Sequence, residues 1–211
     1  AFLLQKYGML FLRGTGMTLL IALTGTALGF VLGLLVAIIR TIALPEKKKA
    51  GSNAGVIVKR GLLRFVHMLM NVYIQVFRGT PMIVQAVVIY YGAQYAGVFM
   101  DTTFAAVFII SINTGAYMAE IIRGGIVSVD KGQFEAAHAI GMTHWQTMTT
   151  VVLPQAIRNI LPSVGNELIV NIKDSSVLNV ISVSELFFQA KSAAGTYYRY
   201  FEVYFIIAVI Y

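Results

Sequence analysis

Long apolar runs separated by short polar segments dominate the chain. The run at residues 16–39 is long enough to cross a hydrocarbon core of about 30 Å as a helix. Similar runs cover residues 81–99, 104–122 and about 155–172, and a last one begins near Tyr197. The pattern predicts an all-α integral membrane protein with five transmembrane helices, and residues 1–211 show no repeat that would divide them into domains.

Two further segments are apolar on one side only. Residues 62–77 lie between two loops that we place in the cytoplasm, one after the first span and one after the third. An even number of spans must separate two loops on the same side of the membrane. This segment is therefore predicted to be an interfacial or half-buried helix that leads into the second span. Thr80 is the expected N-cap of that span and Pro81 its first helical residue. Residues 182–195 predict a short amphipathic helix at the outer surface.

The composition supports a membrane location. Hydrophobic residues make up 58% and charged residues 12% of the 211, and the mean hydropathy is +0.77, which leaves too little polar surface for a soluble globule. The formal charge of +7 comes from clusters between apolar runs, which favours a topology signal over nucleic-acid binding. The largest cluster places its loop in the cytoplasm and the N-terminus outside; it consists of Arg40, Lys47, Lys48, Lys49, Lys59, Arg60 and Arg64.

Catalytic chemistry is not indicated. The chain has no cysteine, no grouping of nucleophile, base and orienting residue, and no glycine-rich phosphate-binding loop that would hydrolyse ATP. His67, His138 and His144 lack metal-ligand spacing. We therefore expect no catalytic residue, metal or bound cofactor. Because the sequence begins at Ala1 without a Met and stops within an apolar run, we also expect both ends to be trimmed and the last helix to be cut short.

The polar segment at about residues 128–154 is predicted to be two short helices joined by a turn. Residues 130–133 fit a capping pattern, Gly141 suits a left-handed helix stop, and residues 143–146 fit a capping box. Glu135, His138 and the Gly141 turn are expected to be accessible. Apolar positions are expected to hold the pair against the membrane part of the protein: Phe134, Ala137, Ile140, Trp145, Met148 and Val152.

This segment resembles the EAA loop of bacterial ATP-binding-cassette (ABC) import permeases. The match rests on Glu135, Ala136, Ala137 and Gly141, followed by "VVLP" at residues 151–154, where Val151 stands in a position usually filled by Ile. "RGTPMIVQ", "AYMAEIIRGGIVSVDKGQFEAA", "LPQAIRNILP" and "NIKDSSV" resemble the polar amino-acid branch of type I permeases in order and spacing between residues 78 and 180.

The resemblance implies a type I ABC importer permease fold with five helices and a cytoplasmic two-helix coupling loop. It further implies a homo- or heterodimer with a second permease subunit, a cytoplasmic ATPase subunit pair that uses ATP and Mg, an extracytoplasmic solute-binding protein, and an amino acid as cargo. The bacterial or archaeal cytoplasmic membrane is the expected location. The implied ATPase-coupling residues are Glu135, Ala136, Ala137, Gly141, His144 and Trp145.

Polar residues inside the spans are the candidates for a substrate pathway, because such residues are costly in lipid and usually face a bundle interior or a path. The third span carries Asn113, Tyr117 and Glu120 on one helical face. The fourth span carries Ser163, Asn166, Glu167, Asn171 and Asp174. Alternative roles remain open: Glu120 could pair with Arg123, Asp174 with Lys173, and the asparagines could join helices. Glu167 favours a cationic amino acid as cargo.

Two other classes of transport protein are compatible with five spans. An ion-coupled secondary amino-acid transporter would need ion sites and usually inverted repeats, which the sequence does not show. A channel would conduct without an ATPase.

Overall fold

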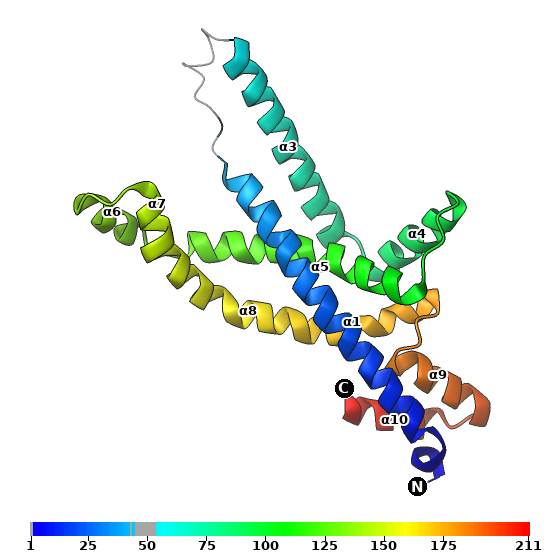
Figure 1. The fold of residues 1–211 in the computed structure, drawn as a ribbon. Coiled ribbons are helices and arrows are strands. Elements are labelled where there is room, and N and C mark those ends of the chain that lie inside the picture. Colours follow the sequence, from blue (N-terminus) through cyan, green and yellow to red (C-terminus); the bar gives the residue numbers. More distant parts are fainter. Residues whose placement is uncertain (1, 43, 45–53) are drawn as a thin grey trace. The chain divides into compact units, whose positions relative to one another are not determined.

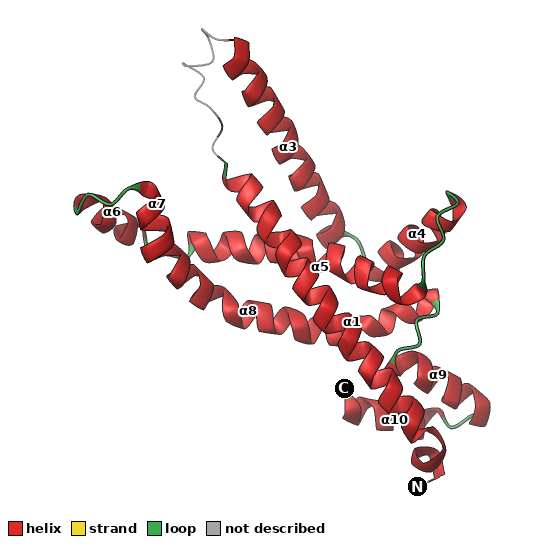
Figure 2. Ribbon diagram, in the orientation of Figure 1, coloured by secondary structure: helices red, strands yellow, loops and turns green. Residues whose placement is uncertain are grey.

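The described residues of the computed structural model, 2–42, 44 and 54–211, form helices joined by short loops (Figure 2). No strand occurs in these ranges. Lys47, Lys48 and Lys49 of the predicted cytoplasmic cluster lie outside them. In chain order the elements are α1 (Phe2–Thr41), α3 (Ala54–Gly79), α4 (Met82–Tyr95), α5 (Thr102–Val127), α6 (Lys131–Ala139), α7 (His144–Gln146), the π-helix η1 (Thr147–Val152), α8 (Leu153–Asp174), the 3-10 helix η2 (Ser175–Ile181), α9 (Leu186–Tyr197) and α10 (Tyr200–Ile210) (Figure 1).

These elements form two compact units. Unit 1 comprises Ala1–Gly29, Thr80–Thr114 and Gly165–Tyr211, and unit 2 comprises Phe30–Gly79 and Gly115–Val164. The chain passes from one unit to the other within α1, α5 and α8 and between α3 and α4. The expectation of one domain stays a prediction.

In unit 1, glycines allow α1 to pack closely on α5. A Cβ at Gly25 would lie 2.5 Å from Ile110 Cγ2, and one at Gly29 would lie 2.6 Å from Thr114 Cβ, so neither position tolerates a side chain without movement. Glycine spacing of four residues is a common way for membrane helices to bring their backbones together. The adjoining core contains Ile21 of α1 with Ile109 and Ile110 of α5.

In unit 2, the same helix pair continues with the same device. A Cβ at Gly33 would lie 2.5 Å from Met118 Cβ. A second close approach joins α5 to α8, because a Cβ at Gly125 would lie 2.1 Å from Ile160 Cγ2. These packings position the two helix ends from which the hairpin at residues 130–152 extends.

The helices only partly establish the predicted spans. Among the described residues, two helices are long and apolar enough to cross a membrane, within α1 and α5, and a third arises if α3 and α4 count as one broken span. The helix α8 coincides with the expected fourth span, but its many polar residues make its mean hydropathy too low for it to count as a candidate span. The helix α10 has only 11 residues. A count of five spans therefore stays a prediction.

The helix α3 is longer than the half-buried segment expected at residues 62–77, since it runs without interruption for 26 residues. The predicted break after it is confirmed, because α3 ends at Gly79 and α4 begins at Met82. The predicted cap was wrong by one residue. Pro81 is the N-cap, and Thr80 instead accepts a hydrogen bond from Gln85 Nε2 at 2.9 Å through its side-chain oxygen.

Candidate functional site

The polar hairpin between α5 and α8 is shaped by local hydrogen bonds. The Asp130 carboxylate accepts from Gly132 N at 2.7 Å and caps α6. Gly141 then takes φ +81°, and its N–H donates to His138 O at 3.0 Å, which ends the helix in a left-handed turn. Thr143 and Gln146 form a capping box at the start of α7, with Gln146 Oε1 accepting from Thr143 N at 2.9 Å. The predicted caps and turn are confirmed.

The second short helix of the hairpin is not separate from the fourth span, contrary to the prediction. Three residues of α7 lead directly into the π-helix η1, and η1 leads into α8 without a loop. Pro154 supplies a physical reason, because it has no N–H to donate to the carbonyl of Thr150 in a regular α-helix. Single π-helical turns are often found at functional sites.

The exposed face of the hairpin carries most of the predicted ATPase-coupling residues. Glu135, Ala136, Gly141 and His144 are exposed, whereas Ala137 is buried. Phe134 and Met148 pack beside Val152 as expected. The expectation was wrong for two apolar residues, since Ile140 and Trp145 are 79% and 74% exposed. Ile140 is the C-cap of α6 and Trp145 lies in the first turn of α7, and neither belongs to the core that contains Val152.

An ion cluster lies where α1 and α5 meet in unit 2. The carboxylate of Glu120 pairs with Arg40 and accepts a hydrogen bond from Arg123 Nη2 at 2.9 Å. The Glu120–Arg123 pair that the sequence offered as an alternative role is therefore present. Arg40 is a second partner of Glu120, which the sequence did not suggest. Glu120 also lines a cavity of about 280 Å³ together with the predicted pathway residue Ser163. The other lining residues are Ile121, Gly124, Gly125, Ser128, Asn159 and Ile160.

A buried polar contact in unit 1 joins three helices. Asn171 of α8 donates through Nδ2 to Thr26 Oγ1 at 2.8 Å and to Thr114 Oγ1 at 2.9 Å. Asn171 is 2% exposed and Thr114 fully buried. This geometry matches the alternative in which an asparagine joins helices, and the two threonine partners were not identified from the sequence.

Asn113 belongs to a second buried chain of hydrogen bonds in unit 1. Its Nδ2 donates to Gln85 Oε1 at 2.9 Å, and Gln85 Nε2 donates to Thr80 O at the same distance. The chain ties α5 to the start of α4. The sequence signal for it was the pair of a glutamine and an asparagine in otherwise apolar runs.

The remaining pathway candidates differ in exposure. Ser163 and Asn166 are exposed, Glu167 is 8% exposed, and Asp174 is half-buried. Tyr117 is half-buried, with the Arg78 guanidinium carbon 5.4 Å from its ring centroid. The sequence did not single out Arg78 as a site residue.

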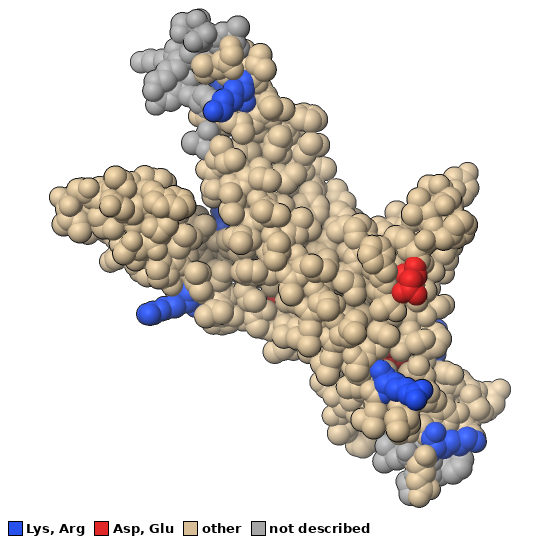
Figure 3. All heavy atoms as spheres, in the orientation of Figure 1, with Lys and Arg blue, Asp and Glu red and all other residues tan. Residues whose placement is uncertain are grey.

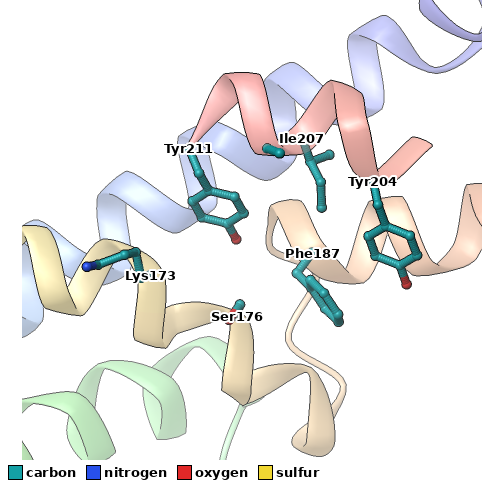
Figure 4. Close-up of a pocket in the computed structure, with 7 residues that line it drawn as sticks. Lys173, Ser176, Phe187, Tyr204, Ile207 and Tyr211 are labelled. Atoms are coloured by element: carbon teal, nitrogen blue, oxygen red, sulfur yellow. The ribbon is translucent and has the colours of Figure 1, made fainter. Parts of the chain in front are cut away.

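Glu185 is a further buried polar residue that the sequence did not single out. Its carboxylate caps α9, accepting from Phe187 N and Phe188 N at 2.7 Å each and from the Tyr211 hydroxyl at 3.1 Å. Burial raises the pKa of this carboxyl, and the hydrogen bonds oppose that rise. Tyr211 also lines a cavity of about 320 Å³ in unit 1 (Figure 4). The cavity contains none of the predicted pathway residues.

The described residues hold no group of three or more His, Asp or Glu side chains placed to bind a metal ion. Most of the visible surface belongs to neither basic nor acidic residues (Figure 3). Long apolar helices, buried hydrogen bonds between them and an exposed capped hairpin are the features of a helical membrane protein.

Comparisons with known proteins agree with this class. Residues 51–211 match the family model described as "Binding-protein-dependent transport system inner membrane component". The chain belongs to this family, whose members are non-enzymatic membrane components that work with binding-protein and ATPase partners. Family membership supports an importer permease and not the ion-coupled alternative.

Two relatives with assigned cargoes cover nearly all of the chain. The glutamine transport system permease protein GlnP of Escherichia coli K12 is 39% identical over 204 residues, covering 96% of this chain and 84% of that protein. The arginine transport system permease protein ArtQ of Bacillus subtilis 168 is 34% identical over 201 residues, covering 95% and 83%.

Solved structures show the same fold. A crystal structure of an amino acid ABC transporter with histidines matches with TM-score 0.85 and 39% identity, covering 99% of this chain and 88% of that one. An inward-facing structure of the MetNI methionine ABC transporter matches with TM-score 0.68 at 20% identity, covering 97% and 91%. The all-α, type I ABC importer permease fold expected from the sequence is thereby confirmed.

Proposed function

We propose that this chain is the permease subunit of an ABC importer that carries a polar amino acid, with basic amino acids as favoured cargo, across the cytoplasmic membrane. The observation that carries the proposal is the relationship to amino-acid permeases over nearly the whole chain. The working complex comprises two permease subunits, two cytoplasmic ATPase subunits that use ATP and Mg, and a solute-binding protein outside.

The hairpin at residues 130–152 is the proposed contact with the ATPase. Its backbone is fixed by caps at both helices, and Ile140 and Trp145 offer exposed apolar side chains that would insert into a cleft on the partner. A rigid hairpin continuous with α8 would transmit movement of the ATPase to that helix. Glu135, Ala136, His144 and the Gly141 turn complete the proposed surface.

Glu167 is the proposed contact for a cationic cargo. Glu167 is 8% exposed within α8, and polar residues inside membrane spans usually face a bundle interior or a substrate path. A carboxylate on such a path could accept hydrogen bonds from an ammonium or guanidinium group of the cargo. We extend the proposed pathway to Asn113, Tyr117, Ser163, Asn166 and Asp174. Asn171 and Glu120 have structural partners and contribute to the pathway through the helices that they hold.

Uptake into reconstituted vesicles that contain the whole complex tests this proposal. With ATP enclosed in the vesicles, on the side that carries the ATPase subunits, the complex should take up arginine or glutamine. A proton or sodium ionophore should not abolish this uptake. The Glu167→Gln variant should lower arginine uptake more than glutamine uptake while the complex still assembles. Equal, wild-type-like uptake of both cargoes would remove Glu167 from the pathway, and absent uptake by the wild type would remove the function.

The proposed orientation places the basic loop inside and the N-terminus outside. Because the chain has no native cysteine, single cysteines report accessibility without background. A Ser192→Cys variant, at an exposed position of α9, should react with a membrane-impermeant thiol reagent in intact cells. A Ser52→Cys variant, outside the described residues, should not react. The reverse pattern would invert the orientation.

A further inference from the structure

The helix α3 carries a continuous polar stripe. With about 100° of rotation per residue, six polar side chains fall within an arc of about 80°. They are Arg60, Arg64, His67, Asn71, Gln75 and Arg78. The opposite side is apolar and exposed, with Val58, Phe65 and Val72 each more than 50% exposed. A membrane helix with this division turns its apolar side to lipid and its polar stripe to protein or water.

Arg78 lies too far along this stripe to reach lipid headgroups at the end where the basic residues cluster. It follows Arg64 by 14 residues, which corresponds to about 21 Å along the helix axis. The hydrocarbon core is about 30 Å thick, so a helix with Arg64 at one headgroup layer places Arg78 inside that core. A guanidinium there requires a specific partner.

The described part of unit 2 offers Arg78 an aromatic partner but no carboxylate. Its guanidinium carbon lies 5.4 Å from the Tyr117 ring centroid, and its side chain remains exposed. Glu120 is paired with two other arginines. The other acidic residues described in unit 2 belong to the hairpin, where Asp130 caps α6 and Glu135 is exposed. The ring face fixes the cation and leaves its N–H edge available for an anion.

We propose that Arg78, held on the face of Tyr117, binds the α-carboxylate of the amino-acid cargo, with Gln75 one turn earlier on the same stripe. This inference rests on the proposed function and adds a residue that selects amino acids over amines or amides. A guanidinium fork matches the two oxygens of a carboxylate and finds no equivalent in a neutral carboxamide. The alternative partner for the Arg78 guanidinium is a carboxylate of the second permease subunit.

Equilibrium binding to the detergent-solubilised permease–ATPase complex, without binding protein, tests the proposal. The probes are arginine and argininamide, and glutamine and glutaminamide. The wild-type complex should bind each acid at least about tenfold more tightly than its amide, which is the order expected for one charge-assisted pair of about 1.4 kcal/mol. Arg78→Gln should remove most of this preference by weakening acid binding, and Arg78→Lys should keep part of it.

Matched variants separate recognition from structure. Tyr117→Phe keeps the ring and should keep the acid preference, whereas Tyr117→Leu should reduce it. Arg64→Gln removes a charge from the same stripe four turns away and should leave the preference unchanged. Assembly of each variant with the ATPase is measured alongside.

Three outcomes would overturn the assignment. The first is an Arg78→Gln complex that keeps the wild-type preference, and the second is a wild-type complex that transports arginine yet does not distinguish it from argininamide. The third is an Arg78→Gln variant in which the two permease subunits associate poorly, while the fraction that does assemble still prefers the acids over the amides. Arg78 would then pair with a carboxylate of the second permease subunit and not with the cargo. Each leaves the proposed function standing, whereas a wild type without ATP-driven uptake of either amino acid refutes the function itself.

Discussion

The hairpin of unit 2 and the Asn171 contact of unit 1 both depend on hydrogen bonds made by small polar side chains, but the partners of those side chains differ. In the hairpin, Asp130 and Thr143 bond to backbone groups two or three residues away, and their side chains remain exposed. In unit 1, Asn171 bonds to threonines 57 and 145 residues away and is buried. The hairpin is therefore specified locally and presents its surface, whereas the Asn171 contact is specified by the fold and holds helices together.

This difference predicts that the two regions fail in different ways. Variants of the hairpin should impair coupling to the ATPase in a complex that remains folded. Variants of the Asn171 contact should lower the stability of the complex while the hairpin keeps its affinity for the ATPase.

The largest effect is expected for Trp145→Ala. A tryptophan that is 74% exposed on a rigid hairpin is the type of residue that dominates interface energetics, and truncating such an anchor typically costs about 2 kcal/mol or more. We expect the affinity of the permease for its ATPase to fall by roughly 30-fold. Co-purification and titration of the ATPase measure it. Leu161→Ala, an exposed apolar residue on α8, is the matched control and should leave the affinity unchanged.

The hairpin shows how much local sequence patterns reveal. The caps at Asp130 and Thr143 and the left-handed turn at Gly141 could be predicted because each depends on residues within one helical turn. The direction of Ile140 and Trp145 could not, since apolar periodicity assumed that both belonged to regular helices. The merging of α7 through η1 into α8 also escaped prediction, because a π-helix depends on the balance between the missing Pro154 donor and packing around Val152.

The buried contacts were predictable only in half. A polar residue in an apolar run can be recognised, so Asn171, Asn113 and Glu120 were identified as special. Their partners lie far away in the sequence, and a single sequence does not show which residues of two helices lie opposite each other. Thr26 and Arg40 therefore became visible only through the packing of α1 on its neighbours. The polar stripe of α3 had a usable signal, the recurrence of polar residues every three or four positions up to Arg78.

The second largest effect is expected for Gly141→Val. Gly141 has φ +81°, and left-handed backbone costs a residue with a Cβ roughly 1–2 kcal/mol. The correctly formed turn should become about tenfold less populated, and substrate-stimulated ATP hydrolysis should fall accordingly. Gly141→Asn tolerates the left-handed region and should retain most activity. Wild-type hydrolysis by the Val variant would show that the turn does not position the ATPase contact.

A smaller effect on a different property is expected for Asn171→Leu. The change removes the hydrogen bonds of Asn171 to Thr26 and Thr114 on two other helices, and such bonds are worth about 0.6 kcal/mol each on average in a membrane protein. The apparent melting temperature of the solubilised complex should fall, and ATPase affinity should not. Asn166→Leu changes an exposed residue of the same helix and should leave the melting temperature near that of the wild type. Equal melting temperatures for the Asn171 variant and the wild type would refute its joining role.

The smallest effect is expected for Thr143→Ala, which removes one half of the capping box. Loss of an N-cap side chain typically costs about 1 kcal/mol, and here the Gln146 side chain still accepts from Thr143 N at 2.9 Å. The start of α7 should fray without disturbing α8, because η1 packs through Val152 into a separate core. Hydrogen exchange should become faster at the backbone amide of Gln146, which donates to the Thr143 hydroxyl at 3.3 Å. Thr143→Ser keeps the acceptor and should preserve slow exchange, and a global rise in exchange across α8 would contradict the local character of the hairpin.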